Sequence, residues 1–182
     1  MNSKRMKQGL MGLALGLGMY GTAQAVNPDT MVVSVTPGNI TFSVSIASVN
    51  ASGYQFGTVN MAATTMSTAA IVVTNNGNIA EYFAMKVSNS APDNWAPVAS
   101  APGADQFTLM AYMNATQPAD ASFANALSGA IPGAGAALYN QASTKTNALS
   151  TKNLWLRLTM PNAITGTGGA QTMTVFVNGQ AS

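Results

Sequence analysis

Few side chains of this chain are candidates for acid–base catalysis, and the candidates that could act as a pair are carboxylates. The 182-residue sequence contains no histidine and no cysteine, which removes the imidazole base, the thiolate nucleophile and most transition-metal ligands. Two carboxylates can serve as the acid and base of a glycosidase, and the candidates are Glu81, Asp93, Asp105 and Asp120. They stand apart among Pro, Ala and Asn. We therefore interpret them as loop residues or caps and expect no enzyme activity.

Oxygen ligands for calcium are also present, since Asp93, Asn94 and Asp105 offer the hard donors that this cation prefers. No dense Asp/Asn loop surrounds them. The glycine-rich stretch Gly166-Thr-Gly-Gly169 lacks the lysine and the following helix that a phosphate-binding loop requires. The sequence therefore predicts neither a metal site nor a cofactor.

The first 25 residues have the organisation of a secretory signal peptide. Three basic residues precede the apolar stretch Leu10–Tyr20, and Ala23-Gln24-Ala25 supplies the small-x-small cleavage pattern. We expect a mature chain, 26–182, that forms one domain and has no membrane span. Its expected destination is the cell surface or the extracellular space, with the periplasm as the alternative.

Removal of the signal peptide changes the charge of the protein. The mature chain keeps four basic residues against five acidic ones, a net charge of −1 at neutral pH. No basic stripe remains for nucleic acid or for an anionic membrane. The mature surface must consist largely of small polar residues, with few charges that would repel a neighbouring molecule.

Short β-type runs separated by Gly, Pro, Asn and Ser make up the mature sequence. Apolar residues recur at every second position, which is typical of a half-buried strand; those expected to face the core are Ile40, Phe42, Val44, Ile46, Leu154, Leu156, Leu158, Val175 and Val177. Other predicted strands are Met31–Val35, Tyr54–Asn60, Ala69–Thr74, Ile79–Ser88 and Gln106–Asn114. This pattern predicts an all-β fold, an antiparallel immunoglobulin-like or jelly-roll β-sandwich.

An irregular insertion, residues 89–152, interrupts this pattern. It is rich in Pro, Ala, Gly and Ser, and beyond the strand at Gln106–Asn114 it contains a possible short helix, Asp120–Leu127. A structureless loop of such length is unusual in a compact domain, so we expect part of it to pack on a sheet.

Two turns are predicted to form hairpins. Asn75-Asn76-Gly77-Asn78 lies between two β runs, and Asn and Gly tolerate the positive φ angles of hairpin turns. The last two strands are separated by Pro161 and Gly-rich residues, and their pairing would set Trp155 across from Phe176 on the outward face. Such an aromatic pair can stack on a sugar or anchor a protein. The interpretation that we favour is that the insertion folds over the pair as a second small core.

Two family resemblances follow from these segments. Tyr54-Gln-Phe-Gly-Thr-Val-Asn60 followed by Ile71-Val-Val-Thr-Asn-Asn-Gly-Asn78 resembles the "FG-x-V … V-x-L-x-N-x-G-N" stretch of ASH (hydin-like) immunoglobulin-type domains. The Asn-x-Gly turn, the irregular insertion, Leu154-Trp155 and the ending Asn178-Gly-Gln180 resemble TasA-type matrix fibre subunits. The resemblance implies an exported sandwich that serves as a structural subunit.

We therefore expect a secreted, non-catalytic structural protein of the cell surface or extracellular matrix, which associates with itself or with other surface proteins through strands or sheets. The candidate interface residues are Val26, Met31, Val33, Val35, Trp155 and Phe176. The alternative function is a carbohydrate-binding or adhesion module that uses the outward aromatic residues.

Overall fold

The computed structural model describes residues 41–47, 53–130 and 145–180, all within one compact unit, Gly38–Ser182. The signal peptide, the interface candidates Val26, Met31, Val33 and Val35, and the predicted core residue Ile40 lie outside the described residues.

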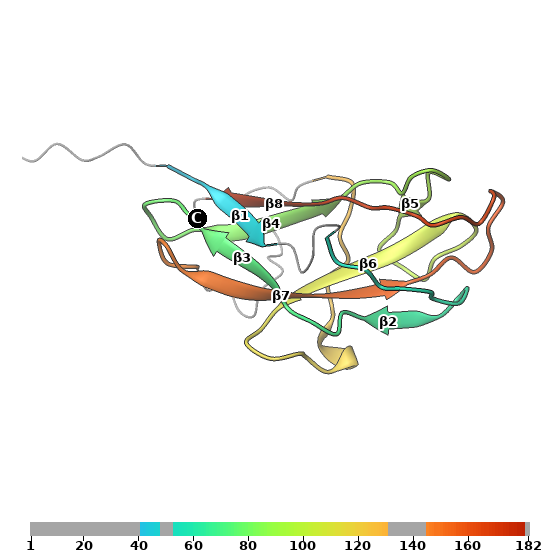
Figure 1. Ribbon diagram of the computed structural model, residues 1–182, viewed down its shortest axis with the longest axis horizontal. Helices are drawn as coiled ribbons and strands as arrows, with labels where there is room; N and C mark the ends of the chain where they lie inside the picture. Colours follow the sequence, from blue (N-terminus) through green and yellow to red (C-terminus); the bar gives the residue numbers. More distant parts are fainter. Residues whose placement is uncertain (1–40, 48–52, 131–144, 181–182) are drawn as a thin grey trace, which may run out of the picture. The chain divides into compact units, whose positions relative to one another are not determined.

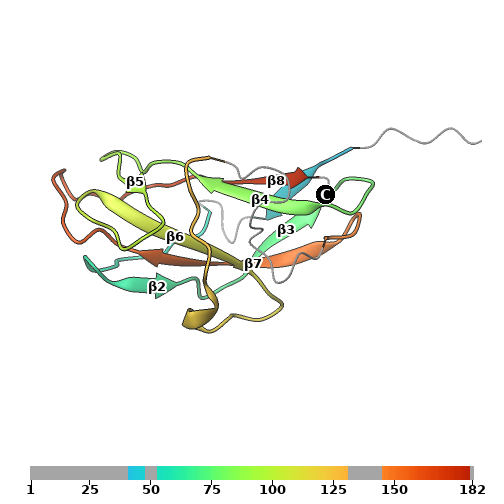
Figure 2. The same cartoon turned by 180° about the vertical axis from the view of Figure 1, so that it is seen from behind.

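The described strands form two sheets (Figures 1 and 2). The larger sheet has the order β1 (Val44–Ala47), β3 (Ile71–Asn75), β7 (Thr151–Thr159), β6 (Gln106–Met113) and β5 (Ala96–Pro97), and β2 (Thr64–Met66) also pairs with β7. The smaller sheet pairs β4 (Tyr82–Val87) with β8 (Val175–Gln180). All these pairs are antiparallel except the short β5–β6 pair, which is parallel.

The two sheets pack face to face around a common apolar core, so the predicted all-β sandwich is confirmed. The largest fully buried side chains come from both layers, with Phe83 and Met85 on β4, Phe107 on β6 and Leu154 on β7. Leu154, Leu156 and Leu158 all belong to this core, as their alternation predicts. Val44, Val175 and Val177 are partly buried against it.

Strand β6 lies inside the predicted irregular insertion, yet it is a full member of the larger sheet. It pairs along its length with β7, from Thr108 opposite Thr159 to Met113 opposite Leu154. The predicted helix at Asp120–Leu127 is reduced to one 3₁₀ turn, Asp120–Ser122. Part of the insertion thus packs on and within the sheet, as its length suggests.

The predicted strand Tyr54–Asn60 is not formed. Gly53 and Gly57 have positive φ angles of 79° and 72°, which an extended strand does not contain. The segment is fastened by a side chain instead: the Tyr54 hydroxyl accepts a hydrogen bond from the Thr68 backbone N–H at 2.7 Å.

The turn Asn75-Asn76-Gly77-Asn78 is real, but it is not a hairpin turn. It joins β3 of the larger sheet to β4 of the smaller one, so the prediction of a hairpin is wrong. The Asn75 side chain closes the turn by accepting a hydrogen bond from the Gly77 N–H at 2.8 Å. A Cβ added at Gly77 would overlap the backbone oxygen of Thr41, so glycine is required there for close chain approach.

The predicted hairpin of the last two strands is also wrong. β7 pairs with β6, β3 and β2, whereas β8 pairs with β4 in the other sheet. The connection after Pro161 therefore crosses from one sheet to the other, as the orange-to-red trace in Figure 1 shows. The residue across from Trp155 is Tyr112, and the residue across from Phe176 is Lys86.

Candidate functional site

Two strand edges come together along one side of the sandwich. β1 is the last strand of the larger sheet and β8 the last strand of the smaller one, and they approach each other (Figures 1 and 2). Among the described strands, none pairs with the second edge of either. We call this region the β1–β8 edge, made of residues 42–46 and 175–179.

Backbone N–H and C=O groups of successive residues in a strand point to opposite sides, so the observed hydrogen bonds show which groups point outward from this edge. The Ser43 carbonyl accepts the Asn76 N–H at 2.7 Å, so the backbone groups of Phe42 and Val44 point away from β3. The Thr174 carbonyl likewise accepts the Ser88 N–H at 2.9 Å, which turns the groups of Val175 away from β4. Both strands thus present donors and acceptors to an added strand.

Apolar side chains accompany these backbone groups. Phe42, Val44 and Ile46 share the face that meets the core. Val44 is half-buried against the core, but Phe42 and Ile46 remain 44% and 41% exposed. The prediction that both would be buried is wrong: β1 is the end strand of the larger sheet and has a paired neighbour on one side only among the described strands.

Trp155 and Phe176 do not form the expected aromatic pair. The Trp155 ring is buried, and its Nε1–H donates to the Asn114 carbonyl at 2.9 Å. The insertion therefore covers the Trp155 side chain, as in the interpretation that the insertion folds over this residue. Phe176 is 43% exposed on the outer face of β8, where the Lys86 ammonium lies 4.8 Å from its ring centroid.

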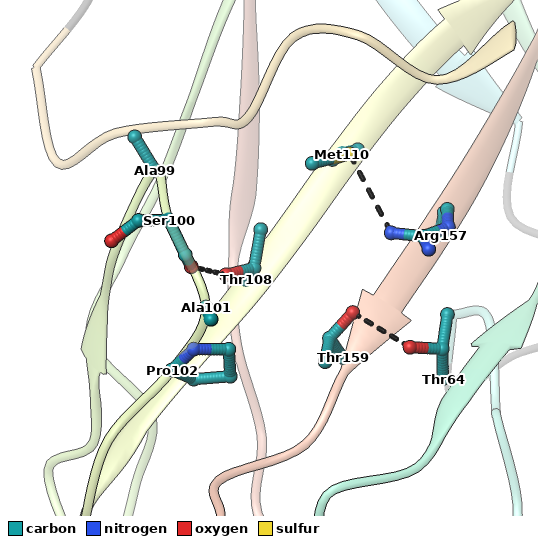
Figure 3. Close-up of a pocket in the computed structure, with 9 residues that line it drawn as sticks. All are labelled: Thr64, Ala99, Ser100, Ala101, Pro102, Thr108, Met110, Arg157 and Thr159. Carbon is teal, nitrogen blue, oxygen red and sulfur yellow. Dashed lines mark hydrogen bonds between the residues drawn. The ribbon is translucent and has the colours of Figure 1, made fainter. Parts of the chain in front are cut away.

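A shallow groove of about 290 Å³ lies on the outer face of the larger sheet (Figure 3). Thr64, Thr159 and Thr108 occupy neighbouring positions on β2, β7 and β6, and the loop 99–102 forms one wall. The hydroxyls of Thr64 and Thr159 lie 3.0 Å apart and hydrogen-bond each other, and that of Thr108 donates to the Ser100 carbonyl at 2.6 Å. These hydroxyls are occupied with internal contacts.

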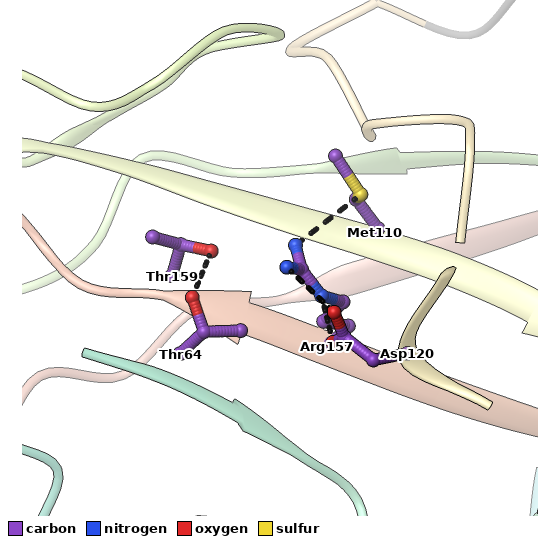
Figure 4. Close-up of polar contacts among 5 residues, drawn as sticks. All are labelled: Thr64, Met110, Asp120, Arg157 and Thr159. Carbon is purple, nitrogen blue, oxygen red and sulfur yellow. Dashed lines mark hydrogen bonds and ion pairs between the residues drawn. The ribbon is translucent and has the colours of Figure 1, made fainter. Parts of the chain in front are cut away.

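Arg157 lies beside this groove and is held by the insertion (Figure 4). Its Nε–H donates to Asp120 Oδ1 at 2.5 Å, and a terminal N–H donates to the Met110 sulfur at 3.7 Å. The hydrogen bond from Arg157 lowers the pKa of Asp120 below its ordinary value. This ion pair fastens the 3₁₀ turn to β7 and leaves Asp120 a structural role.

Asp93 and Asp105 brace the connection between β7 and β8. The Thr165 backbone N–H donates to Asp105 at 2.8 Å, and hydrogen bonds from Thr165 lower the pKa of this carboxyl. Asp93 accepts the Gln171 side-chain amide at 2.9 Å. Within the described residues no three acidic side chains gather in a group that could hold a metal ion.

Comparisons with known protein families, curated proteins and solved structures find no match for this chain. The two family resemblances therefore stay predictions, and function is argued from geometry. Within the described ranges, no helix has the length and apolar character needed to cross a membrane.

Proposed function

We propose that the protein is an exported structural subunit that associates with copies of itself, or with other surface proteins, by β-strand addition. The observation that carries this proposal is the β1–β8 edge, where the backbone groups of two strand edges have no partner strand among the described strands and lie beside exposed Phe42 and Ile46. Monomeric sheet proteins protect such edges with charges, prolines or bulges. Residues 41–47 contain no charge and no proline, so this edge lacks the usual protection.

The N-terminal segment of the mature chain is the proposed added strand. Met31, Val33 and Val35 alternate with Val32 and Ser34, which gives one apolar face of the kind that covers a core. In the sequence, the predicted turn residues 36–39 separate this segment from the strand run that contains β1. The same residues could pair with their own β1 as a hairpin; in a neighbouring molecule they would add to the β1–β8 edge and cover Phe42 and Ile46.

Strand addition between two molecules requires several stabilising contacts to form at the same time. A backbone hydrogen bond contributes only about 0.5–1.5 kcal/mol net, so one or two cannot offset the entropy lost on association. Fully burying a valine contributes about 1.5–3 kcal/mol more. An added strand that supplies three apolar side chains and a ladder of hydrogen bonds meets this requirement.

Deletion of Val26–Val35 tests the proposal. The mature protein should form higher-order assemblies in negative-stain electron microscopy and sedimentation, and the truncated protein should stay monomeric with an unchanged circular dichroism spectrum. Two double variants with the same number of added charges test whether one face of this strand is responsible. Val33→Asp with Val35→Asp should abolish assembly, whereas Val32→Asp with Ser34→Asp, on the opposite face, should leave most of it.

The acceptor side has its own matched pair. Phe42→Ser with Ile46→Ser should abolish assembly, and Met61→Ser with Leu149→Ser, which removes exposed apolar side chains elsewhere, should not. Assemblies that persist unchanged after the N-terminal deletion would show that strand addition from this end is wrong. The carbohydrate-binding alternative loses its motivating feature, because Trp155 is buried and does not pair with Phe176.

A further inference from the structure

One carboxyl group lies inside the sandwich. The inward row of β4 runs Phe83, Met85 and Val87, and extending its alternation by one step places Glu81 on the same row. The Glu81 side chain is 0% exposed, as are its three apolar companions. A carboxylate in such surroundings loses its hydration, so it needs a partner or a proton.

Hydrogen bonding does not compensate this burial. Among the residues that the structure describes, neither carboxyl oxygen of Glu81 has a hydrogen-bond partner, and the buried hydroxyl of Thr146 has none either. Loss of solvation consequently raises the pKa of Glu81 above its ordinary value.

The backbone of Glu81 fastens a second segment to β4. The Glu81 N–H donates to the Thr146 carbonyl at 3.0 Å, and the Thr146 N–H donates to the Glu81 carbonyl at 2.8 Å. The carboxyl group itself lies against β8, where a Cβ added at Gly179 would overlap it. Three segments therefore meet at this one side chain.

Two cationic side chains lie on segments that adjoin Glu81. Lys145 directs its ammonium over the ring of Tyr82, 5.4 Å from the centroid, and Tyr82 lies on the opposite face of β4 from Glu81. Lys152 lies on β7 at the same end of the sandwich, and burial lowers its pKa. The adjoining residues of β3 and β8, Asn75 and Gly179, carry no charge.

We propose that Glu81 is a proton-operated latch at this end of the sandwich. When protonated, the carboxyl group stays inside and residues 145–147 stay paired with β4. When deprotonated, the carboxylate is more stable in water than inside the sandwich. Deprotonation therefore promotes local release of residues 145–147. This inference stands whether or not the protein assembles by strand addition.

The sign of the pH effect follows from the raised pKa. The folded state binds the proton more tightly than the unfolded state does, so stability is fully present below the ordinary value of 4.5 and is lost as pH rises through the folded-state pKa. In this window one proton changes the unfolding equilibrium constant by up to about tenfold per pH unit.

Urea denaturation at a series of pH values tests the latch. The wild type should lose stability as pH rises above 4.5, whereas Glu81→Gln should show a flatter profile and greater stability at neutral pH. Asp105→Asn is the matched control. In the wild type the pKa of the Asp105 carboxyl is lowered from 3.8, so the stability that this group contributes is lost as pH falls. The substitution should therefore leave the pH dependence of stability above 4.5 unchanged.

Measurements on single residues show whether the pH-dependent opening occurs at Glu81 and residues 145–147. Hydrogen exchange of the Thr146 amide, corrected for intrinsic pH dependence, should accelerate with pH relative to that of the Ser67 amide, which is bonded to Leu156 in the larger sheet. The Glu81 carboxyl signal in wild-type NMR spectra should titrate over the same pH range, which keeps the test valid if Glu81→Gln fails to fold. Identical pH profiles for wild type and Glu81→Gln, or an ordinary Glu81 titration, would overturn the proposal.

Discussion

Replacing Phe83 with alanine should lower the free energy of unfolding by about 3–5 kcal/mol, the usual cost of removing a buried aromatic side chain. Phe83 is fully buried on β4 and belongs to the core cluster shared by both sheets. The smaller sheet has two strands in the described chain, so few neighbours can move to fill the cavity. Urea denaturation should show a lower midpoint with an unchanged slope, because the surface exposed on unfolding stays similar.

Phe176→Ala is the control for this experiment. The two phenylalanines lie in the same sheet, but Phe176 is 43% exposed on the outer face, and its main described contact is the Lys86 ammonium. Its removal should cost about 1 kcal/mol or less. Equal losses for both variants would mean that the faces of this sheet are assigned the wrong way round.

The alternation of apolar residues was sufficient to predict strands and their inward rows. Leu154, Leu156 and Leu158 recur at a period of two, and they face the core because only one face of β7 meets the other sheet. The strand within the insertion, β6, was predicted from a run with apolar residues on both faces. The short strand β2 has no such pattern in three residues, and its pairing with β7 defines it.

Strand pairing was less predictable, because turn chemistry shows where a chain reverses and not which strand lies next to it. Asn75–Asn78 has the composition of a hairpin turn, yet it carries the chain from one sheet to the other. The connection after Pro161 does the same. In both cases a distant segment supplies the neighbour: Ser150 for Asn75, and β4 for β8.

Burial depends on what covers a face, and this too is a property of distant residues. Trp155 points away from the core, but the insertion covers it. Phe42 and Ile46 lie on the same face as the half-buried Val44, but on the end strand of the larger sheet they remain exposed. The interpretation of Glu81 as a loop residue or cap is wrong, because its side chain is fully buried. Glu81 extends the inward row of Phe83 and Met85, but that row alone does not show that an acidic side chain stays inside.

Replacing Asn75 with alanine should destabilise the protein by about 3 kcal/mol or more, because each buried polar group left unsatisfied costs about 1–3 kcal/mol. The Asn75 side chain is fully buried. Its Nδ2 donates to the carbonyls of Ile79, Thr146 and Asn147 at 2.8, 2.9 and 3.1 Å. Alanine would remove the donor to the Ile79 carbonyl and the acceptor of the Gly77 N–H, and the Thr146 and Asn147 carbonyls would keep only the backbone N–H groups of Glu81 and Ser150 among their described donors. The neighbouring Asn76→Ala is the control, because Asn76 is exposed and its described side-chain hydrogen bond is to the Ser45 hydroxyl.

The variant Asn75→Asp tests whether the donated hydrogen bonds of Asn75, and not only the size of its side chain, stabilise the turn. It keeps the size of asparagine and the oxygen that accepts the Gly77 N–H, but it replaces the donating amide with a second oxygen facing three carbonyls. At neutral pH, Asn75→Asp should therefore be less stable than Asn75→Ala, because a buried charge is added to the lost hydrogen bonds. Acidification should reverse the order, since a protonated carboxyl can donate one hydrogen bond. Urea denaturation of both variants across the acidic range measures this crossover, and an Asn75→Asp protein as stable as the wild type would show that the amide donor is not needed.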